Sequence, residues 1–316
     1  NIEDVNHKYM FLKSRTIRIK GKLDYKYIHI PINILKKLDE IKPDIIIGSE
    51  YNPTVLLAYS WSKVKNKKFI SWSDGTLNSE KNITLIQQKL RKIICSGSHA
   101  LIASSTKTKE AQLYYGAKSK IFLSYLTIDI NKYICENEYN KNNNIIFVGT
   151  LSQRKGIDLL FEALKDVNIN YKLKLIGSGE DENKLRNLSI KLGIDKKVEF
   201  LGFKQREELV NLYKNSNLFV LPSRQDCFGL VINEAMCAGL PVIVSKYADG
   251  SYDLIDQGKG GYIIDPLDTE QFKKTIEYML TNHNKIKTMG MYNKNKILLF
   301  DIENVAKEYL NAIDYV

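Results

Sequence analysis

The sequence predicts an α/β protein of two domains, each built on a doubly wound parallel sheet. Three observations lead to this prediction. At 316 residues the chain is long enough for two domains of ordinary size. Short apolar runs rich in β-branched residues recur along it, and amphipathic stretches at helical spacing separate them. Gly, Pro and polar residues bound these runs, as is typical of buried parallel strands followed by turns.

The first half of the chain predicts strands joined by helices and a linker at its end. The residue before Pro43 is pushed out of the helical region, so a helix is expected to end there. Ser104, Ser105 and Thr106 can cap a further helix. Residues 1–20 carry no clear pattern, and the polar residues 126–144 are the expected linker. We expect strands at 27–30, 45–47, 69–72, 100–104 and 120–123, and helices at 34–41, 52–63 and 84–94.

The second half is more regular, because strands and helices alternate at an even pitch. This alternation is typical of a parallel sheet with right-handed crossovers. An amphipathic tail follows at residues 302–309. The expected strands are 145–148, 171–176, 198–201, 218–221, 242–244 and 262–264, and the expected helices are 157–164, 181–192, 206–213, one from about Gly229, 249–255 and 268–280.

Composition and charge narrow the class of protein. A hydrophobic content of 44% and a charged content of 26% are typical of a globular chain. The net charge of +11 lies entirely in residues 1–143, which hold 24 Lys and Arg against 13 Asp and Glu. Such a basic half favours a polyanion or an anionic membrane surface as partner, and a merely solvated lysine-rich surface is the alternative. No recognition motif for nucleic acid is present, so we expect no nucleic-acid partner.

The four cysteines show no spacing typical of a metal site, and the four histidines are scattered singly. We therefore expect reduced thiols, a cytoplasmic protein and no metal. No run of 18 apolar residues predicts a membrane-spanning helix. Because the first half is basic, we also expect that the protein can attach peripherally to the inner face of the plasma membrane.

Residues 222–241 are the most informative stretch. They lie between two apolar strands and contain a helix that starts near Gly229 and ends at Gly239. The stretch carries Asp226 on its loop and Glu234 on its helix. Backbone N–H groups at the helix start, together with the helix dipole, suit a phosphate. An ordinary strand–helix unit with two solvated acids is the alternative.

This stretch, PSRQDCFGLVINEAMCAGLP, resembles the donor-sugar motif of retaining GT-B glycosyltransferases of family 4, in the glycogen-synthase-like superfamily. That family writes two Glu residues separated by seven positions, and here Asp226 stands at the first. The resemblance implies two Rossmann-like domains facing a cleft. Residues 1–138 would form the acceptor-side domain, residues 139–299 would bind the nucleotide sugar, and the tail 300–316 would pack back on the first domain. The opening strand, Gly-rich loop and helix of the family are not found, so we expect a first domain incomplete at its N-terminus.

Charged residues follow two of the expected strands. The loop from Gly149 to Gly156 carries Arg154 and Lys155 before a helix, and basic residues at a helix start are unfavourable unless an anion binds there. The family writes Gly-Arg at the start of this loop, where Thr150 stands here. It commonly places a His near Asp74, where an Asp-Gly turn is the alternative reading.

The resemblance implies a site for a nucleotide sugar made from these loops. The residues with catalytic roles would be Asp226, Lys155, Arg154 and Asp74. Asp226 would accept hydrogen bonds from the transferred sugar, and Arg154 and Lys155 would bind the diphosphate. Glu234 would accept from the ribose, and the loop at 202–204 would hold the base. The donor-binding residues would be Gly149, Thr150, Gly177, Gly202, Phe203, Lys204, Cys227, Phe228, Gly229, Leu230 and Glu234.

The implied function is retaining transfer of a hexose-type sugar from a nucleotide sugar to a glycan, lipid-linked or protein acceptor, in cell-surface polysaccharide or glycoconjugate synthesis. A UDP-sugar is favoured by its frequency in the family, and no cofactor or metal is expected. Two alternatives stay open. One is a non-transferring protein of the same fold, such as a nucleotide-sugar epimerase. The other is a catalytically weakened sugar-nucleotide-binding subunit, since Thr150 and Asp226 depart from the family pattern.

Overall fold

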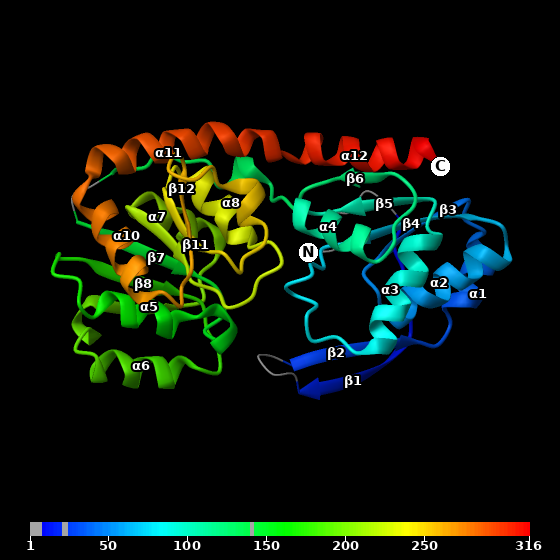
Figure 1. Ribbon diagram of the computed structural model, residues 1–316, viewed down its shortest axis with the longest axis horizontal. Helices are drawn as coiled ribbons and strands as arrows, with labels where there is room; N and C mark the ends of the chain where they lie inside the picture. Colours follow the sequence, from blue (N-terminus) through cyan, green and yellow to red (C-terminus); the bar gives the residue numbers. More distant parts are fainter. Residues whose placement is uncertain (1–7, 21–24, 140–141) are drawn as a thin grey trace.

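The computed structural model describes residues 8–20, 25–139 and 142–316, which form two lobes side by side (Figure 1). A four-stranded sheet lies in one lobe, here called the N-lobe, and a six-stranded sheet in the other, the C-lobe. Every strand pair within these two sheets is parallel. The alternation of strands and helices confirms the predicted α/β class with two parallel sheets. The strand order reverses in the C-lobe sheet, which is doubly wound, whereas the N-lobe strands follow one another in sequence order.

The N-lobe sheet has the strand order β3-β4-β5-β6. Its helices begin at polar caps: Asn52, Thr84 and Ser105 each accept a backbone N–H, which is why their helices start there. The strands are β3 (Ile45–Ser49), β4 (Lys68–Ser73), β5 (Ala100–Ala103) and β6 (Ile121–Leu123), and the helices are α1 (Ile34–Ile41), α2 (Pro53–Val64), α3 (Leu85–Gly97) and α4 (Thr106–Tyr114).

A separate antiparallel hairpin precedes the N-lobe sheet. It pairs β1 (Ser14–Lys20) with β2 (Tyr25–Pro31) and packs against α2 (Figure 1). The sequence predicted a strand only at residues 27–30. The expectation that residues 1–20 carry no clear pattern was in part wrong, because residues 14–20 form β1. Residues 1–7 lie outside the described part of the chain.

The C-lobe sheet has the strand order β12-β11-β10-β7-β8-β9. All six predicted strands are confirmed, whereas the helix predicted at 249–255 is shorter than expected. The strands are β7 (Asn144–Val148), β8 (Lys172–Ile176), β9 (Val198–Gly202), β10 (Leu218–Leu221), β11 (Val242–Ser245) and β12 (Gly261–Ile264), and the helices between them are α5 (Ile157–Leu164), α6 (Glu182–Lys191), α7 (Arg206–Lys214), α8 (Leu230–Cys237) and α9 (Ser251–Leu254).

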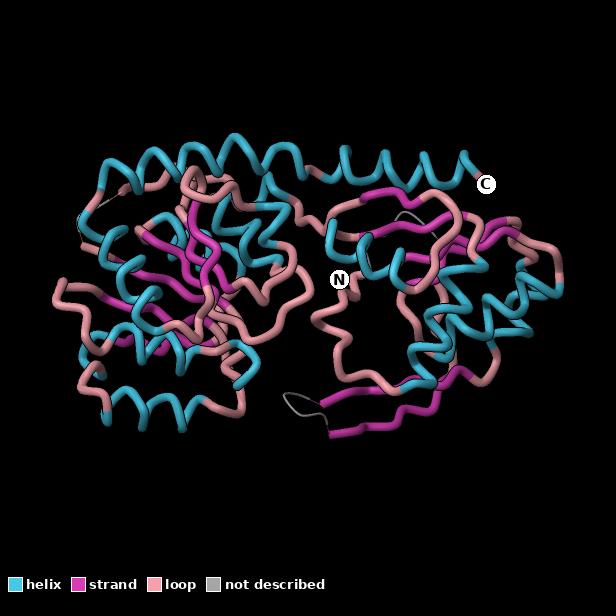
Figure 2. The backbone as a smooth tube through the Cα atoms, viewed as in Figure 1, coloured by secondary structure: helices cyan, strands magenta, loops and turns pink. Residues whose placement is uncertain are grey.

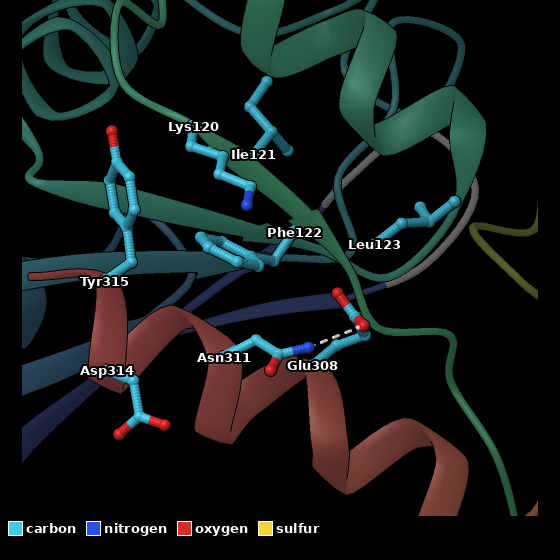
Figure 3. Close-up of a pocket in the computed structure, with 8 residues that line it drawn as sticks. All are labelled: Lys120, Ile121, Phe122, Leu123, Glu308, Asn311, Asp314 and Tyr315. Carbon is cyan, nitrogen blue, oxygen red and sulfur yellow. Dashed lines mark hydrogen bonds between the residues drawn. The ribbon is translucent and has the colours of Figure 1, made fainter.

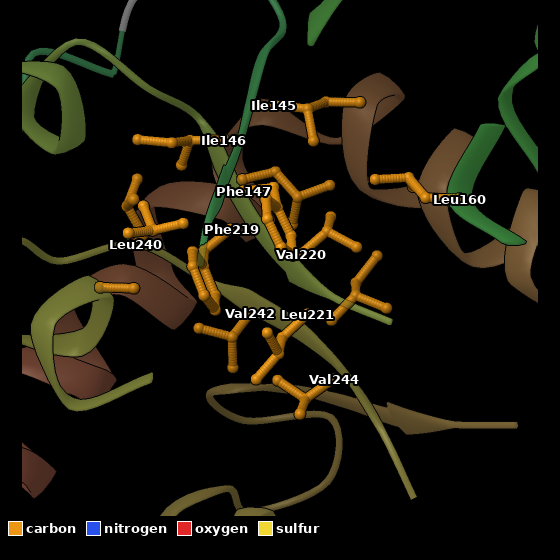
Figure 4. Packing of buried hydrophobic residues seen from close by; sticks show 14 of the residues in the cluster. Ile145, Ile146, Phe147, Leu160, Phe219, Val220, Leu221, Leu240, Val242 and Val244 are labelled. Carbon is orange, nitrogen blue, oxygen red and sulfur yellow. The ribbon is translucent and has the colours of Figure 1, made fainter. Parts of the chain in front are cut away.

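The centre of the C-lobe is a dry apolar core around β7, β10 and β11 (Figure 4). Every residue of these three strands is buried. Phe147 and Phe219 are among the largest fully buried side chains. Helices cover both faces of the sheet, which explains why the strands are continuous apolar runs rather than alternating ones. This packing fixes the ends of β7 and β10, from which the candidate site is built.

Three helices follow the C-lobe sheet: α10 (Thr269–Thr281), α11 (His283–Ile297) and α12 (Ile302–Tyr315). Helix α11 was not predicted. It packs on α8, and α12 packs on β5 and β6, so the chain returns to the N-lobe (Figure 2). The outward passage of the chain, near residues 125–127, lies beside this return. Thr127 donates a hydrogen bond to the carbonyl of Phe300, and the rings of Tyr125 and Phe300 lie 4.9 Å apart.

In the part of the chain that the structure describes, no helix combines the length and the apolar character needed to cross a bilayer.

Candidate functional site

The candidate site lies where the direction of strand order reverses in the C-lobe sheet. From β7 the chain winds outward through β8 and β9, then returns to place β10 on the other side of β7. The loops after β7 and β10 therefore leave neighbouring strand ends in different directions. In open α/β sheets this point opens a crevice beyond the carboxyl ends of the strands, and ligands bind there.

Hydrogen bonds join the loops after β7 and β10 to each other. The guanidinium of Arg224 donates to both carboxylate oxygens of Asp158, at 2.7 and 2.6 Å. It also donates to the carbonyl of Gln153 at 2.9 Å, and its backbone N–H donates to the carbonyl of Arg154 at 2.8 Å. A bidentate Arg–carboxylate pair fixes orientation as well as distance. The two loops therefore form one unit.

This unit brings Lys155 and Asp226 together. The ammonium of Lys155 lies 2.5 Å from the carboxylate of Asp226, and Lys155 is only 8% exposed. Arg154 lies beside the same loop and donates to the carbonyl of Gln225 at 3.3 Å. Thr150 is exposed at the start of the loop after β7. The predicted cations are thus directed at the loop of Asp226 rather than into solvent.

The expected position of Arg154 and Lys155 at the start of a helix is wrong. Arg154 and Lys155 do not begin a helix against its dipole, because they form a 3-10 turn (Gln153–Lys155). Helix α5 begins three residues after Arg154, at Ile157, and carries Asp158 in its first turn, where a negative charge is favourable. The unfavourable interaction of these cations with a helix dipole, which had favoured a bound anion, is therefore absent. The prediction that Arg154 and Lys155 bind an anion now depends on the contacts that they make.

Helix α8 starts at the same crevice. Its N-cap is Gly229 at φ 84°, and no side chain of the described residues caps it by a hydrogen bond. A Cβ at Gly229 would lie 3.1 and 3.2 Å from side-chain atoms of Ile232 and Leu221, so the tight start suits glycine. The N–H groups of Leu230 and Val231 have no partner within the helix, which is the usual property of a helix start, whereas the N–H of Ile232 donates to the carbonyl of Gly229 at 2.8 Å. The side chain of Phe228, by contrast, is buried in the core, so only its backbone can face a ligand.

Three glycines end the strands on the other side of the crevice. Gly149 and Gly177 directly follow β7 and β8, and Gly202 is the last residue of β9; their φ angles are 154°, 129° and 67°. Gly177 donates its N–H to the carbonyl of Gly202, and a Cβ on Gly177 would lie 2.0 Å from the carbonyl oxygen of Gly149. The three strand ends thus meet backbone to backbone. Beyond them Phe203 is 72% exposed, and Lys204 pairs with Glu208 at 2.9 Å.

Glu234 lies on α8 and is partly buried. It accepts a hydrogen bond from the hydroxyl of Tyr213 at 2.8 Å. Burial raises the pKa of Glu234, while hydrogen bonds from Tyr213 and Tyr133 act in the opposite direction. The two tyrosines hold the carboxylate in one orientation. The role of Glu234 as a ribose acceptor stays a prediction.

The N-lobe touches this unit through the loops after β4 and β5. Thr76 donates a hydrogen bond to the carboxylate of Asp249. The amide of Gln225 donates to the carbonyl of Ser79 at 2.8 Å. Further along, the backbone N–H of Thr106 donates to Asp253 at 3.0 Å. The predicted Asp74 lies two residues before Thr76 in the loop after β4, so the structure brings it to the same boundary as Asp226.

Glu50 is the residue of this region that sequence reasoning missed. It follows β3 and accepts a hydrogen bond from the backbone N–H of Asp74 at 2.7 Å. Burial, and then the nearby charge of Asp74, raise the pKa of Glu50 to about 8. Burial also raises the pKa of Asp74, and the charge of Asp226 acts in the same direction. The pKa of the Cys227 thiol rises to about 12, first through burial and then through Asp74.

The described residues contain no group of three or more His, Cys, Asp or Glu side chains arranged to hold a metal ion. Lys155 and Arg154 bring positive charge to the loop of Asp226. A separate hollow of about 500 Å³ lies between β6 and α12 (Figure 3). Its lining includes Lys120, Phe122 and Tyr315, with Glu308 and Asn311 joined by a hydrogen bond of 3.0 Å. None of the predicted site residues lines it.

This chain is similar to known proteins in both sequence and fold. Residues 133–296 match the family described as Glycosyl transferases group 1. An uncharacterised glycosyltransferase of Methanocaldococcus jannaschii is 28% identical over 205 residues, 56% of this chain and 57% of that protein. One of Haemophilus influenzae is 25% identical over 299 residues, 92% of this chain and 82% of that protein. The capsular polysaccharide biosynthesis glycosyltransferase CapM of Staphylococcus aureus is 28% identical over 208 residues, 63% of this chain and 54% of that protein. The matched part thus spans little more than half of the first and third relatives.

Two solved structures share the fold over most of the chain. The apo form of the lipopolysaccharide outer core galactosyltransferase WaaB has a TM-score of 0.75 and 25% identity, and covers 89% of this chain and 78% of its own. Anabaena HepE in complex with UDP has a TM-score of 0.80 and 19% identity, and covers 90% of this chain and 81% of its own. Both likenesses extend across the N-lobe as well as the C-lobe.

Proposed function

Because this chain belongs to the Glycosyl transferases group 1 family and has the GT-B fold, we propose that it is a retaining glycosyltransferase of family 4. It transfers a hexose-type sugar from a nucleotide-sugar donor to an acceptor. The observation that carries this proposal is the meeting of Lys155, Asp226 and the start of α8 at the switch point of the C-lobe sheet. A cation, an acid and free N–H groups are there within one crevice.

The chemistry of the donor explains why these groups are needed. When the glycosidic bond breaks, negative charge develops on the leaving diphosphate, and fixed positive groups stabilise it. Lys155, Arg154 and the first N–H groups of α8 provide this stabilisation, so no metal cofactor is needed. Asp226 accepts hydrogen bonds from hydroxyls of the sugar, and Glu234 accepts them from the ribose. The loop from Gly202 to Lys204 holds the base.

The donor in this proposal is a UDP-sugar, and the acceptor is a glycan, a lipid-linked sugar or a protein in cell-surface polysaccharide or glycoconjugate synthesis. The structural neighbour HepE, which was solved with UDP, supports the choice of donor. CapM, named for capsular polysaccharide biosynthesis, supports the class of acceptor. Residues 139–299 bind the donor, and residues 1–138 together with the tail 300–316 bind the acceptor.

Peripheral attachment to an anionic membrane surface is part of this proposal. The hairpin and the segment before it expose Tyr9, Phe11 and Tyr27 beside the cations Lys13 and Arg15. Exposed aromatic rings among cations suit the surface of an anionic bilayer. Binding to vesicles of phosphatidylglycerol at low salt, lost at high salt, is the expected result. Failure to bind such vesicles at low salt contradicts this part alone.

The test of the main proposal is a thermal-shift screen of the purified chain against UDP-, GDP- and ADP-sugars, followed by turnover of the sugar that binds. A ligand that binds only the folded state raises the melting temperature. We expect a UDP-sugar to do so and to release UDP, and a Lys155→Ala variant to lose both effects. Binding without any release of UDP would favour the sugar-nucleotide-binding alternative, and isomerised donor would favour the epimerase alternative. Retention is checked by NMR of the anomeric proton in donor and product.

A further inference from the structure

Glu50 has an unusual backbone conformation at the carboxyl end of β3. Its φ of 66° lies in the left-handed region, which non-glycine residues adopt rarely and mostly where the surrounding structure imposes it. Its own N–H donates to the carbonyl of Trp72 at 2.9 Å. β3 and β4 are paired up to Ser49 and Trp72, so the turn at Glu50 aims its side chain at the loop after β4.

The carboxyl group of Glu50 holds that loop by two hydrogen bonds. It accepts the backbone N–H of Asp74 at 2.7 Å and the hydroxyl of Ser73 at 3.3 Å. Ser73 in turn accepts the N–H of Gly75 at 2.9 Å. The backbone of Asp74 is therefore fixed from β3, which is a neighbouring strand, rather than by its own turn. An ordinary Asp-Gly turn does not need such a support.

Asp74 faces the C-lobe loop that carries Asp226. The amide of Gln225, next to Asp226, binds the carbonyl of Ser79 in the same N-lobe loop. Asp226 is close enough to raise the pKa of Asp74, after the larger effect of burial. The two carboxyl groups thus lie on loops that contact each other at the boundary between the lobes, where an acceptor and a donor sugar would meet.

We propose that Glu50 is a positioning residue for the sugar transfer, which holds Asp74 opposite Asp226 so that the reacting sugars are held between these two carboxyl groups. This inference rests on the proposed function. The N-lobe then contributes a pair of carboxyl groups, Glu50 after β3 and Asp74 after β4. Asp74 lies near the position where the family commonly has a histidine.

The charges around the pair explain how two acids can lie side by side. Burial raises the pKa of Glu50 to about 8, with Asp74 as the next cause, so at neutral pH Glu50 keeps its proton. It can then donate a hydrogen bond to the carboxylate of Asp74, and this bond partly opposes the rise in the pKa of Asp74 that burial causes. Among the described groups that also face the pair are the acid Glu80, the phenol of Tyr51 and the thiol of Cys227.

Two ion pairs limit the remaining repulsion in this region. Arg91 binds Glu80 at 2.7 Å, and Lys155 binds Asp226 at 2.5 Å. When the pH rises through about 8, Glu50 loses its proton and a second negative charge appears beside Asp74. The two carboxylates then repel each other, and Asp74 is no longer held in one place. Turnover should therefore fall above this pH.

The test compares Glu50→Gln, Glu50→Ala and Asp74→Asn with wild type, and uses Glu162→Gln on the exposed face of α5 as the matched control. The probe is whichever of UDP-glucose, UDP-galactose and UDP-N-acetylglucosamine gives the largest thermal shift with wild type. Readouts are the affinity for UDP, kcat, KM for the donor, and the pH profile of kcat/KM between pH 6 and 9.

We expect all variants to bind UDP within about twofold of wild type, because Glu50 does not touch the diphosphate site. Glu50→Ala and Asp74→Asn should lower kcat by about tenfold or more, since a small misplacement of a reacting group is costly. Glu50→Gln can still accept the N–H of Asp74 but cannot ionise, so it should keep most of its turnover and lose the decline near pH 8. The control should match wild type.

Three outcomes separate the possibilities. If wild type turns over the donor while Glu50→Ala keeps the kcat and pH profile of wild type, the inference is wrong and the proposed function stands. If Glu50→Ala unfolds, the pH profile of Glu50→Gln decides: a decline near pH 8 identical to that of wild type overturns the inference. If wild type neither binds nor turns over any nucleotide sugar, the proposed function fails and the inference falls with it.

Discussion

Lys155 and Asp226 form an ion pair of 2.5 Å although they lie 71 residues apart in the sequence. They follow neighbouring parallel strands, β7 and β10, and both are largely buried. In the proposed function Lys155 binds the diphosphate and Asp226 binds the sugar. The ammonium is therefore shared between the two halves of the donor site. Binding of the diphosphate would draw it partly away from Asp226 and leave that carboxylate able to accept sugar hydroxyls.

The first prediction concerns this sharing. Asp226→Asn should bind UDP more tightly than wild type, by about threefold to tenfold, because Lys155 loses a competing anion. Lys155→Met should weaken UDP binding by about tenfold to a hundredfold. Turnover of the nucleotide sugar should fall in both. Calorimetric titration with UDP makes the comparison, with Lys165→Met at the exposed C-cap of α5 as the control. Equal weakening by both substitutions would show that the pair acts only as a structural bridge.

The second prediction concerns the meeting of strand ends at Gly177. A methyl group at Gly177 would lie 2.0 Å from the carbonyl oxygen of Gly149, and the φ of 129° is unfavourable for alanine. Gly177→Ala should therefore lower the free energy of unfolding by about 2–4 kcal/mol. Gly193, at φ 68° with nothing within 4 Å of its added Cβ, is the matched control, and Gly193→Ala should cost only about 1 kcal/mol. Urea unfolding measures both, and similar losses would argue against the close backbone contact.

The third prediction concerns Arg224, which joins the loops after β7 and β10. Arg224→Ala removes both bonds to Asp158 and the bond to the carbonyl of Gln153. Because Asp158 is partly exposed, the loss of stability should be modest, about 1 kcal/mol. The KM for the donor should rise by more than this loss of stability alone would suggest, because Arg224 holds the loop after β7, which carries Lys155. Arg224→Lys should be intermediate, because lysine cannot make the bidentate contact. An unchanged KM in both variants would mean that the loops keep their places without this contact.

The fourth prediction concerns pH and stability. The pKa of Glu50 is raised in the folded protein from its ordinary value of 4.5 to about 8. The folded state therefore holds this proton where the unfolded state releases it. Stability from this group is complete below about pH 4.5 and is lost progressively as the pH rises to about 8. Glu50→Gln should remove this part of the decline, on the order of 1–3 kcal/mol. Urea unfolding at a series of pH values measures the slope, and an unchanged slope would contradict the raised pKa.

The fifth prediction is that turnover needs no divalent cation. Lys155, Arg154 and the start of α8 supply the positive charge that a metal would otherwise bring to the diphosphate. Activity of the purified chain should be unchanged within about twofold after treatment with EDTA, because no step depends on a metal Lewis acid. Recovery of lost activity by added magnesium or manganese would require a different account of the donor site.

The C-lobe could be predicted well from the sequence because its strands are buried on both faces. Residues 218–221 and 242–244 are continuous apolar runs, and the structure places β10 and β11 there. The start of α8 at Gly229 could also be predicted, since glycine at a left-handed N-cap and an apolar helix face follow each other directly. In each case the local pattern and the tertiary environment require the same structure.

Other features could not be predicted because they depend on neighbours distant in the sequence. Glu50 looks like a solvated acid after a strand, and only the pairing of β3 with β4 brings it to Asp74. Helix α11 contains Gly290 in its middle, which argues against a helix. In the structure a Cβ there would lie 2.0 Å from the carbonyl of Gly239, so the glycine permits close packing on the end of α8. The contact of Thr76 with Asp249 joins two loops 173 residues apart.

The chain passes between the lobes twice, and the two passages touch at Tyr125, Thr127 and Phe300. Because the two connections are held together at one place, we expect the lobes to rotate about that place as rigid bodies, with little sliding or twisting between them. Opening would break the bonds of Thr76 to Asp249 and of Gln225 to Ser79, which lie on loops away from the hinge. Glu50 and Asp74 would then move with the N-lobe, and Lys155 and Asp226 with the C-lobe.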